Sequence, residues 1–260
     1  MPDLRKSWDK IAVEYRRRYF ISTETVHYGP LCPGEDKLRL IGPIAGKKAI
    51  DLGCGGGQNA IALAKSGADV TAIDFSTNQL AEAERLAISS KVNVQFLRRD
   101  ITDLTGLPDN SFDLALSACA MAFVKDLGGA IAEVARILKD DGKFILSVMH
   151  PMQYILDGDQ DSMTFNSTFP FRPRLLRWNW EFPQAKARFQ HYLRSVADYH
   201  NTLVESGLIV TRILEPKPTL QTPHYGFSKE IMREYPYIAR HLPITLIFVS
   251  IKRQKESPHG

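Results

Sequence analysis

The chain has 260 residues, of which 44% are hydrophobic and 24% are charged. This composition is typical of a globular protein rather than a disordered chain, and the length suits one large domain or two small ones. The net charge of +4 is a weak basic excess, so it does not indicate a nucleic-acid-binding surface. The sequence has no run of about 20 apolar residues, so we expect no transmembrane helix.

The cysteines and the N-terminus indicate the compartment. Cys32, Cys54 and Cys119 form an odd, widely spaced set that fits neither a disulfide framework nor a zinc site. The N-terminus lacks the apolar segment of a secretory signal. We therefore expect a cytoplasmic protein. Because no carboxylates cluster with a clear spacing, we also expect no bound metal.

Hydrophobic periodicity predicts the elements in chain order. An amphipathic helix is expected over residues 5–20, with Trp8 and Tyr15 on its apolar stripe, and a loop rich in Gly and Pro follows at 27–36. From residue 48 onwards strands and helices alternate, which indicates a parallel sheet with helices on both faces. The expected strands are 48–52, 69–75, 92–97, 112–117 and 143–149, and the expected helices are 59–66, 76–90 and 127–138.

The alternation stops after His150. Residues 151–190 are rich in Pro, Trp and Phe and show no clear period, so we expect an insertion that covers the carboxyl ends of the strands as a lid. A helix over 192–206 and strands at 208–214 and 243–252 are expected to complete the fold. The chain is interpreted as one domain, 1–260, made of an N-terminal helix and entry loop (1–45), a cofactor-binding core (46–150), a lid insertion (151–190), and a last helix with a strand pair (191–260).

The clearest motif is AIDLGCGGGQNAIALA at residues 49–64, in which a strand leads through a glycine-rich turn into a helix. Gly53, Gly55 and Gly57 permit positive φ angles and let a ligand approach the backbone. The amides of the turn and the helix N-terminus point at that ligand. Asp51 precedes the glycines, and Asp74 closes the next strand, where a carboxylate can accept both hydroxyls of a ribose.

Two classes of cofactor fit such a turn. Gly55, Gly57 and Ala60 match the dinucleotide pattern GxGxxA, with Asp74 as the ribose ligand. A pyrophosphate at this turn would meet the negative charge of Asp51, whereas a cationic ligand would be attracted by it. The final strand pair also departs from the all-parallel sheet of dinucleotide-binding domains.

Several motifs, taken in order, resemble the class I S-adenosylmethionine (SAM)-dependent methyltransferases, particularly the small-molecule branch. IDLGCGGG is similar to their first motif, VTAIDFS to the acidic loop that holds the ribose, and RRDITDLTGLPDNSFDLALS to the adenine loop and fourth strand. EVARILKDDGKFILSVMHP resembles the helix and fifth strand that follow, and ESGLIVTRILEPKP and HLPITLIFVSIKR resemble the last two strands. The resemblance implies a Rossmann-like methyltransferase fold: an α/β fold with a seven-stranded, mostly parallel sheet, an antiparallel last strand and helices on both faces, here with the lid insertion.

The resemblance also implies a cofactor site for SAM and its product S-adenosylhomocysteine (SAH). Asp74 would bind the ribose, and Asp100 would accept from the adenine amino group, although Asp100 could instead cap a turn. Gln58 and Asn59 could donate to the cofactor or cap their helix. The expected cofactor-binding residues are Tyr28, Asp51, Gly53, Gly55, Gly57, Gln58, Asn59, Asp74, Phe75, Gln79, Asp100, Ile101, Ser117 and Ala118.

The expected chemistry is an in-line methyl transfer, which depends mainly on alignment and on exclusion of water. If a general base is used, His150 at the end of the fifth strand is the best-placed candidate. Trp178, Trp180, Phe182 and Phe189 in the insertion indicate an apolar or aromatic small-molecule acceptor, or packing of the lid onto the core. The expected substrate-binding residues are Tyr19, Met121, Phe123, His191 and Tyr192, of which Met121 and Phe123 could equally be core and His191 and Tyr192 a structural pair.

Other functions remain as alternatives. A nucleic-acid base methyltransferase usually carries Asn or Asp followed by Pro-Pro-aromatic after the fourth strand, where this chain reads SACAMAF. This departure argues against such enzymes. An RNA or protein methyltransferase is the first alternative, and a nicotinamide-dependent oxidoreductase, supported by GxGxxA alone, is the second. We expect a small-molecule methyl acceptor as the partner, with no nucleic acid and no membrane, and the sequence leaves the oligomeric state open.

Overall fold

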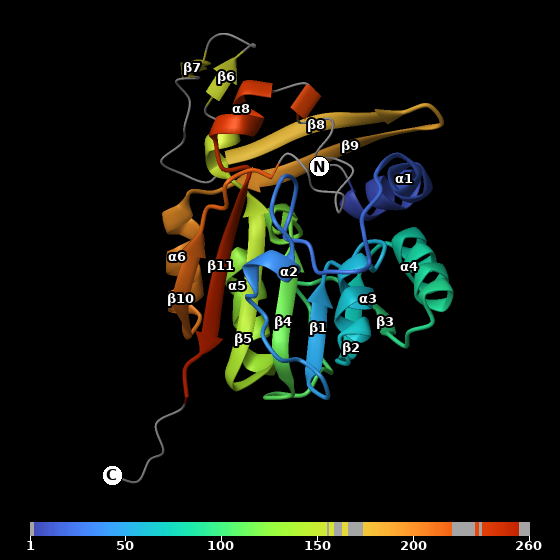
Figure 1. The fold of residues 1–260 in the computed structure, drawn as a ribbon, viewed down its shortest axis with the longest axis vertical. Coiled ribbons are helices and arrows are strands. Elements are labelled where there is room, and N and C mark those ends of the chain that lie inside the picture. The colour runs from blue at the N-terminus through green and yellow to red at the C-terminus, as the bar shows by residue number, and fades with distance from the viewer. Residues whose placement is uncertain are drawn as a thin grey trace.

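The computed structural model describes residues 3–154, 156–158, 163–165, 174–219, 232–233 and 236–254. Part of the expected lid insertion therefore lies outside the described residues. Within them, seven strands form one sheet at the centre of the molecule (Figure 1). These strands are β1 (Lys48–Leu52), β2 (Asp69–Asp74), β3 (Gln95–Arg98), β4 (Phe112–Ala118), β5 (Leu138–Met149), β10 (Leu208–Leu214) and β11 (Thr245–Lys252).

The strand order is β10-β11-β5-β4-β1-β2-β3. Strands β1 to β5 pair in parallel, whereas β11 runs antiparallel to both β5 and β10. The Rossmann-like sheet with an antiparallel last strand is thus confirmed. The order reverses between β1 and β4, and the carboxyl ends of strands at such a reversal are where open α/β sheets bind ligands.

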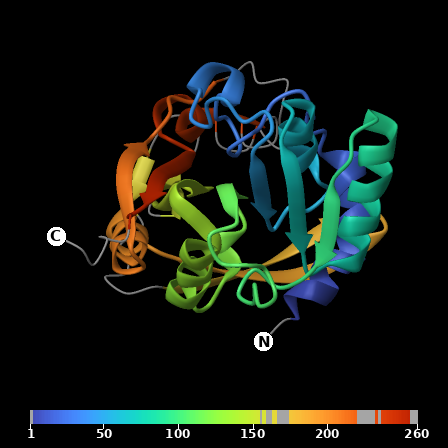
Figure 2. The same ribbon diagram turned by 90° about the horizontal axis from the view of Figure 1, so that it is seen from below.

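Helices cover both faces of the sheet (Figure 2). Apolar residues of α3 and α4 are buried in one core cluster, and those of α5 and α6 are buried in another. Two short 3₁₀ helices, η1 (Met121–Phe123) and η2 (Pro151–Tyr154), follow β4 and β5. The α-helices are α1 (Leu4–Arg18), α2 (Glu35–Leu38), α3 (Gln58–Lys65), α4 (Thr77–Ser90), α5 (Leu127–Ile137), α6 (Val196–Glu205) and α8 (Pro236–His241).

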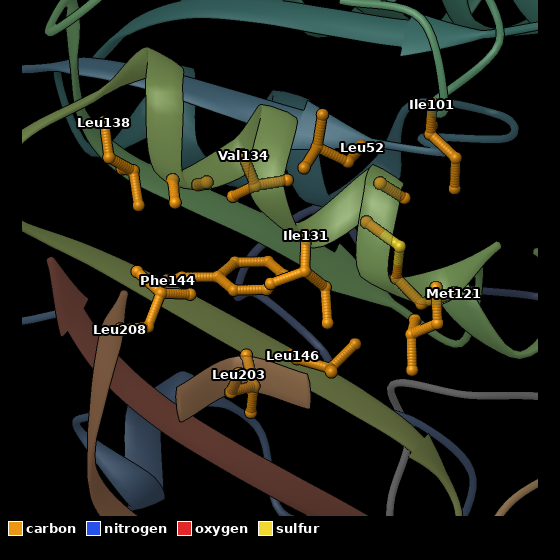
Figure 3. Close-up of a cluster of buried hydrophobic side chains, with 14 of the residues drawn as sticks. Leu52, Ile101, Met121, Ile131, Val134, Leu138, Phe144, Leu146, Leu203 and Leu208 are labelled. Carbon is orange, nitrogen blue, oxygen red and sulfur yellow. The ribbon is translucent and has the colours of Figure 1, made fainter. Parts of the chain in front are cut away.

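The amphipathic pattern of α5 explains how the second cluster forms. Ile131 and Val134 are fully buried on one face of this helix, and they belong to the same cluster as Phe144 and Leu146 of β5 and Leu203 of α6 (Figure 3). Burial of each such side chain contributes about 1.5–3 kcal/mol. This packing fixes β5 and its neighbour β4, whose ends carry candidate site residues.

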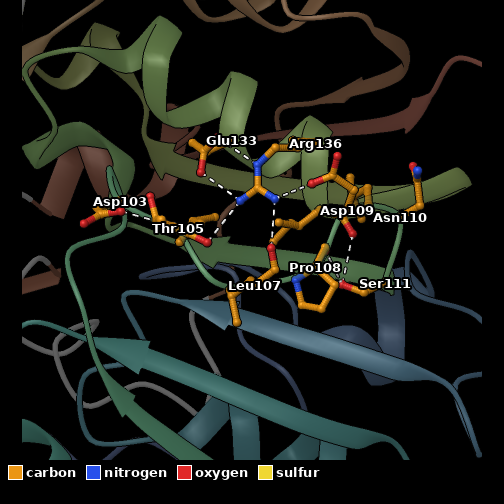
Figure 4. A network of polar contacts seen from close by, with 12 residues as sticks. Asp103, Thr105, Leu107, Pro108, Asp109, Asn110, Ser111, Glu133 and Arg136 are labelled. Atoms are coloured by element: carbon orange, nitrogen blue, oxygen red, sulfur yellow. Dashed lines mark hydrogen bonds and ion pairs between the residues drawn. The ribbon is translucent and has the colours of Figure 1, made fainter.

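Arg136 of α5 holds the loop that leads from β3 to β4 (Figure 4). Its guanidinium donates to the backbone oxygens of Leu104 at 3.0 Å and Leu107 at 2.8 Å, and it also pairs with Glu133 and Asp109. The two carbonyl bonds tie this loop to the helix. The start of the same loop, at Asp100 and Ile101, is where the sequence predicts the adenine contacts.

Strands β8 (Arg174–Phe182) and β9 (Ala185–Leu193) form an antiparallel hairpin that crosses the carboxyl-end side of the sheet beside α1 (Figure 1). Strands β6 (Leu156–Gly158) and β7 (Met163–Phe165) form a second, short pair. The prediction that a helix starts at Tyr192 is wrong, because Tyr192 lies on β9. The helix starts only after Ser195, which forms a reciprocal capping box with Asp198.

Helix α1 is fastened to the sheet domain by polar contacts. Asp9 accepts hydrogen bonds from the Ser76 hydroxyl at 2.7 Å and from the Asn78 backbone at 3.1 Å, at the start of α4. In the last turn of α1, Arg16 pairs with Glu82 of α4 at 2.9 Å. The helix is therefore held next to the end of β2, where Asp74 lies. None of the helices in the described residues is long and apolar enough to cross a membrane.

Candidate active site

A cavity of about 1850 Å³ opens at the carboxyl ends of the parallel strands. One part is walled by the turn after β1 and by the ends of β2, β3 and β4, and the other part by α1, η1 and the β8–β9 hairpin. A pocket for one small ligand has a volume of roughly 300–1,000 Å³. The cavity is therefore large enough for two small molecules side by side.

Three of the four glycines in the turn after β1, Gly53, Gly55 and Gly57, have positive φ, but for different structural reasons. A Cβ atom on Gly53 would lie 2.4 Å from Cβ of Ala120, and one on Gly57 would lie 2.8 Å from Cβ of Ala83. At Gly55 the nearest atom would be Oε1 of Gln79, 3.9 Å away. Gly53 and Gly57 thus allow close packing of neighbouring segments, whereas Gly55 leaves its side of the turn open to the cavity.

Two buried carboxylates flank the turn. Asp51 is 1% exposed, and its Oδ2 has no hydrogen-bond partner in the described part of the chain. Asp74 accepts from the Gly55 amide at 2.9 Å and from the Ser76 amide at 2.8 Å, so it shapes the turn. Burial raises the pKa of Asp51 to about 7 and that of Asp74 to about 6. A cationic or hydroxyl-bearing ligand would stabilise the ionised forms of both.

Most of the predicted cofactor-binding residues line this cavity. Asn59 does so while its side-chain amide forms two hydrogen bonds with the backbone of His27, so it anchors the entry loop. One oxygen of Asp100 accepts from the backbone and hydroxyl of Thr102, which is the turn-capping role that the sequence left open. The cavity-lining members of the set are Asp51, Gly53, Gly55, Gln58, Asn59, Asp74, Phe75, Gln79, Asp100, Ile101 and Ala118.

Tyr28, Gly57 and Ser117 do not line the cavity, contrary to the expectation from the sequence. Tyr28 is fully buried and donates its hydroxyl proton to Glu35 at 2.5 Å, which fixes the entry loop. The Ser117 hydroxyl is directed to the Leu52 carbonyl at 3.2 Å, between neighbouring strands. These three residues support the site through packing and backbone geometry.

His150 and Met121 do not lie where their predicted roles, general base and substrate contact, would require. His150 is 2% exposed and is not part of the cavity wall. Its Nδ1 accepts from the Met152 amide at 3.1 Å, so in the neutral ring the proton is on Nε2, which lies 2.8 Å from Glu215. Both ring nitrogens are thus engaged, and His150 is not placed to act as a general base. Met121 is fully buried in the core, the alternative that the sequence left open.

Aromatic side chains build the wall away from the glycine turn. The Trp8 ring of α1 lies 5.9 Å from that of Phe123 and 6.1 Å from that of Trp180 in edge-to-face geometry. The other predicted acceptor residues Tyr19, His191 and Tyr192 also line this part. Phe182 and Phe189 are buried and pack the hairpin onto α1, so the insertion aromatics divide between wall and core.

His191 is a neutral group in this wall. Burial, and to a lesser extent the charge of Arg194, lowers its pKa to about 4. Its ring lies 5.0 Å from that of Trp178. Sequence reasoning missed Trp8 as a wall residue, along with Cys119, Gln190 and Arg194, which also line the cavity. For Arg194, the sequence did offer a signal, because a charged residue directly follows the alternating apolar residues of β9.

No group of three or more His, Cys, Asp or Glu side chains among the described residues is arranged to hold a metal ion. Around the glycine turn, the polar atoms of the cavity are instead separate carboxylates, amides and backbone groups. This arrangement can bind an organic molecule with hydroxyl and amino groups at one end, next to an apolar compartment at the other.

Comparisons with known proteins agree with this picture. A family model described as a methyltransferase domain matches residues 50–146. An uncharacterized methyltransferase, YbaJ, of Bacillus subtilis (strain 168) is 33% identical over 235 residues, which cover 82% of this chain and 89% of that protein. A demethylmenaquinone methyltransferase of Clavibacter sepedonicus is 34% identical over 122 residues, covering 45% of this chain and 49% of that protein.

A solved structure described as an S-adenosylmethionine-dependent methyltransferase from Listeria monocytogenes has 27% identity and a TM-score of 0.61, covering 83% of this chain and 95% of that one. The relationship to YbaJ extends over most of both chains, so it includes the hairpin region as well as the family-model match. The chain therefore belongs to the class I SAM-dependent methyltransferases, and SAM is its cofactor.

Proposed function

We propose that this methyltransferase transfers the methyl group of SAM to a small apolar or aromatic metabolite in the cytoplasm. The observation that carries the proposal is the continuity of the cavity from the carboxylates beside the glycine turn to the aromatic wall formed by Trp8, Phe123, Trp178 and Trp180. A demethylmenaquinone methyltransferase among the relatives is consistent with an aromatic small-molecule acceptor. The three free cysteines in the described residues suit a reducing compartment.

The turn after β1 is the proposed site for the amino-acid end of SAM. The partnerless, buried Oδ2 of Asp51 fits an ammonium group, because that cation would supply both the missing hydrogen bond and the counter-charge. The N-cap residue of α3 is Gly57, so no side chain of that residue caps the first amides of the helix. Those amides are suited to the carboxylate of SAM. Gly53, Gly55 and Gln58 complete this part of the wall.

The ends of β2 and β3 are the proposed site for the adenosine end. Asp74 has a free lone pair on each carboxylate oxygen after its two backbone bonds, so it can accept from ribose hydroxyls. Phe75 and Ile101 offer apolar contact to the adenine, and the carboxylate of Asp100 offers an acceptor for its amino group. The β8–β9 hairpin would act as the lid over both ligands.

SAM supplies a methyl group on a positively charged sulfur, which leaves as a neutral thioether, so the protein mainly has to align the acceptor and exclude water. The wall aromatics and the hairpin would perform both tasks. His191, neutral at pH 7, is the proposed group that orients the acceptor through its ring nitrogens, in place of His150. Ala118, at the end of β4, would lie beside the reacting centre.

The test measures cofactor and acceptor binding separately. Isothermal titration calorimetry with SAH should show binding to the wild-type protein and at least tenfold weaker binding to Asp74→Ala, since two charge-assisted hydrogen bonds are lost. The matched control is Asp69→Ala, at the opposite, exposed end of β2. Absence of SAH binding, or equal affinity in a folded Asp74→Ala protein, would refute the assigned cofactor site.

The acceptor is then identified with SAM labelled in the methyl group and a metabolite extract of the source cell. Label should appear in a small apolar or aromatic product. Trp178→Ala should reduce that product formation while leaving SAH affinity unchanged, because Trp178 lies in the aromatic wall. Transfer of label to RNA or protein alone would contradict the small-molecule proposal.

A further inference from the structure

Arg194 is a buried cation in the acceptor part of the cavity. It directly follows β9, is 6% exposed and lines the cavity. Its Nη2 donates to the carbonyl oxygens of Val124 at 2.6 Å and Lys125 at 3.0 Å, and its guanidinium carbon lies 5.1 Å from the centre of the Tyr192 ring. These contacts hold the guanidinium in place over an aromatic ring.

Within the described residues, no carboxylate balances the charge of Arg194. Its Nη1 is buried without a hydrogen-bond partner in the described part of the chain, and no carboxylate of those residues forms an ion pair with it. The titratable neighbours do not compensate. Burial raises the pKa of Tyr199 to about 12 although Arg194 lowers it, and the pKa of His191 is about 4, so both groups are neutral near pH 7.

A buried cation without a counter-charge is destabilising, whereas an anion that binds a guanidinium forms short, charge-assisted hydrogen bonds. A second unsatisfied atom lies on the same segment, because Oε1 of Gln190 is also buried without a partner in the described residues. The wall is therefore not uniformly apolar. It carries fixed polar atoms within an aromatic surface, which is how small-molecule sites set ligand orientation.

We propose that the methyl acceptor is an aromatic carboxylic acid, whose carboxylate binds Arg194 through Nη1 while its ring lies against the aromatic wall. This inference rests on the proposed small-molecule function and narrows its substrate class. Burial and, to a lesser extent, the charge of Arg194 lower the pKa of His191, so its ring is neutral beside the bound acid.

The experiment compares acids with their primary amides on the SAH-loaded protein. The probe pairs are benzoate and benzamide, 1-naphthoate and 1-naphthamide, 2-naphthoate and 2-naphthamide, and indole-3-acetate and its amide, each measured by calorimetry. At least one acid should bind at least tenfold more tightly than its amide. Arg194→Gln should abolish that preference. Arg177→Gln should retain it, because Arg177 also lines the cavity but its side chain is exposed.

The outcomes separate this inference from the proposed function. Binding of SAH without any preference for an acid over its amide would overturn the aromatic-acid proposal alone, whereas absence of SAH binding would overturn the cofactor site. Acid preference that persists in Arg194→Gln would also overturn the proposal.

A second measurement needs no variant, in case Arg194→Gln does not fold. Binding of an acid that neutralises the Arg194 charge should raise the pKa of His191, and binding of the matching amide should leave that pKa unchanged. NMR titration of the His191 imidazole in the wild-type protein measures the pKa. An unchanged His191 titration with a bound acid would contradict the pairing.

Discussion

Replacing Asp51 by Asn separates the stability of the ligand-free protein from its affinity for the cofactor. The pKa of this carboxyl is raised from 3.8 to about 7 by burial. A change of that size corresponds to about 4 kcal/mol of lost stabilisation of the ionised form in the folded state. The Asn amide removes the charge, but a buried amide without a partner costs about 1–3 kcal/mol. We therefore expect Asp51→Asn to be more stable than wild type by about 1–3 kcal/mol at pH 8.

The pH dependence has a defined sign. Because the folded pKa lies above the unfolded value, the folded protein binds the extra proton between pH 4 and 7, and the contribution of Asp51 to stability falls as the pH rises through that window. The advantage of Asp51→Asn should therefore shrink by about 2–3 kcal/mol between pH 8 and pH 5. Thermal or denaturant unfolding at the two pH values measures this difference, at about 2–4 °C per kcal/mol for a chain of this size.

Cofactor affinity should move in the opposite direction. Loss of a charge-assisted bond to the ammonium group weakens SAH binding by about tenfold to a hundredfold. In the wild-type protein, binding near pH 7 should release protons as Asp51 ionises, which calorimetry in buffers of different ionisation enthalpy detects.

Asp113→Asn is the matched control, because Asp113 is stabilised by Lys139 at 2.8 Å and by the Lys48 amide at 2.9 Å, away from the cavity. It should lower stability and leave SAH affinity unchanged. The reasoning is refuted if Asp51→Asn shows no gain at pH 8, a gain independent of pH, or wild-type SAH affinity.

Three further substitutions test the packing around the site. Gly53 and Gly46 have nearly the same φ, +74 and +73, but only at Gly53 would a Cβ lie against another residue. Gly46→Ala should therefore lower the free energy of unfolding by about 1–2 kcal/mol. Gly53→Ala should lower it further and abolish SAH binding measured by calorimetry. Arg136→Ala should lower the free energy of unfolding, measured by denaturant titration, by about 2 kcal/mol. The control Arg17→Ala, at an exposed position, should lower it by about 0.5 kcal/mol or less. Equal effects would contradict the loop-anchoring role of Arg136. Trp8→Ala should destabilise by about 3 kcal/mol and increase hydrogen exchange in β8 and β9, and unchanged exchange there would show that α1 does not support the hairpin.

The sequence predicted the glycine turn and the carboxylates beside it well, because their determinants are local. A glycine turn between a buried strand and a helix, followed by an acidic residue at the end of the next strand, specifies which backbone atoms meet at the sheet edge. Asp51, Gly55 and Asp74 accordingly line the cavity. The first strands also lie where alternation placed them, since each is bounded by glycines or by the cap of the next helix.

The part of the cavity proposed for the acceptor depends on contacts between segments that are far apart in the sequence. The alternation of Trp178, Trp180 and Phe182 becomes a β-hairpin face only because α1 supplies a surface on which those rings pack. Propensity alone did not separate that face from an irregular insertion, and the helix expected from residue 192 starts only at the Ser195 cap.

The sequence by itself therefore determined the fold class and the glycine turn, because period and spacing encode them along the chain, and the resemblance of its motifs to a known family indicated the cofactor. Only the tertiary structure decided which side chains face the cavity. His150 has both ring nitrogens bonded away from the cavity, and Tyr28 is buried in the entry loop, whereas Arg194 lines the cavity with no ion pair among the described residues. Burial and hydrogen-bond satisfaction are properties of assembled surfaces, so no local pattern encodes them.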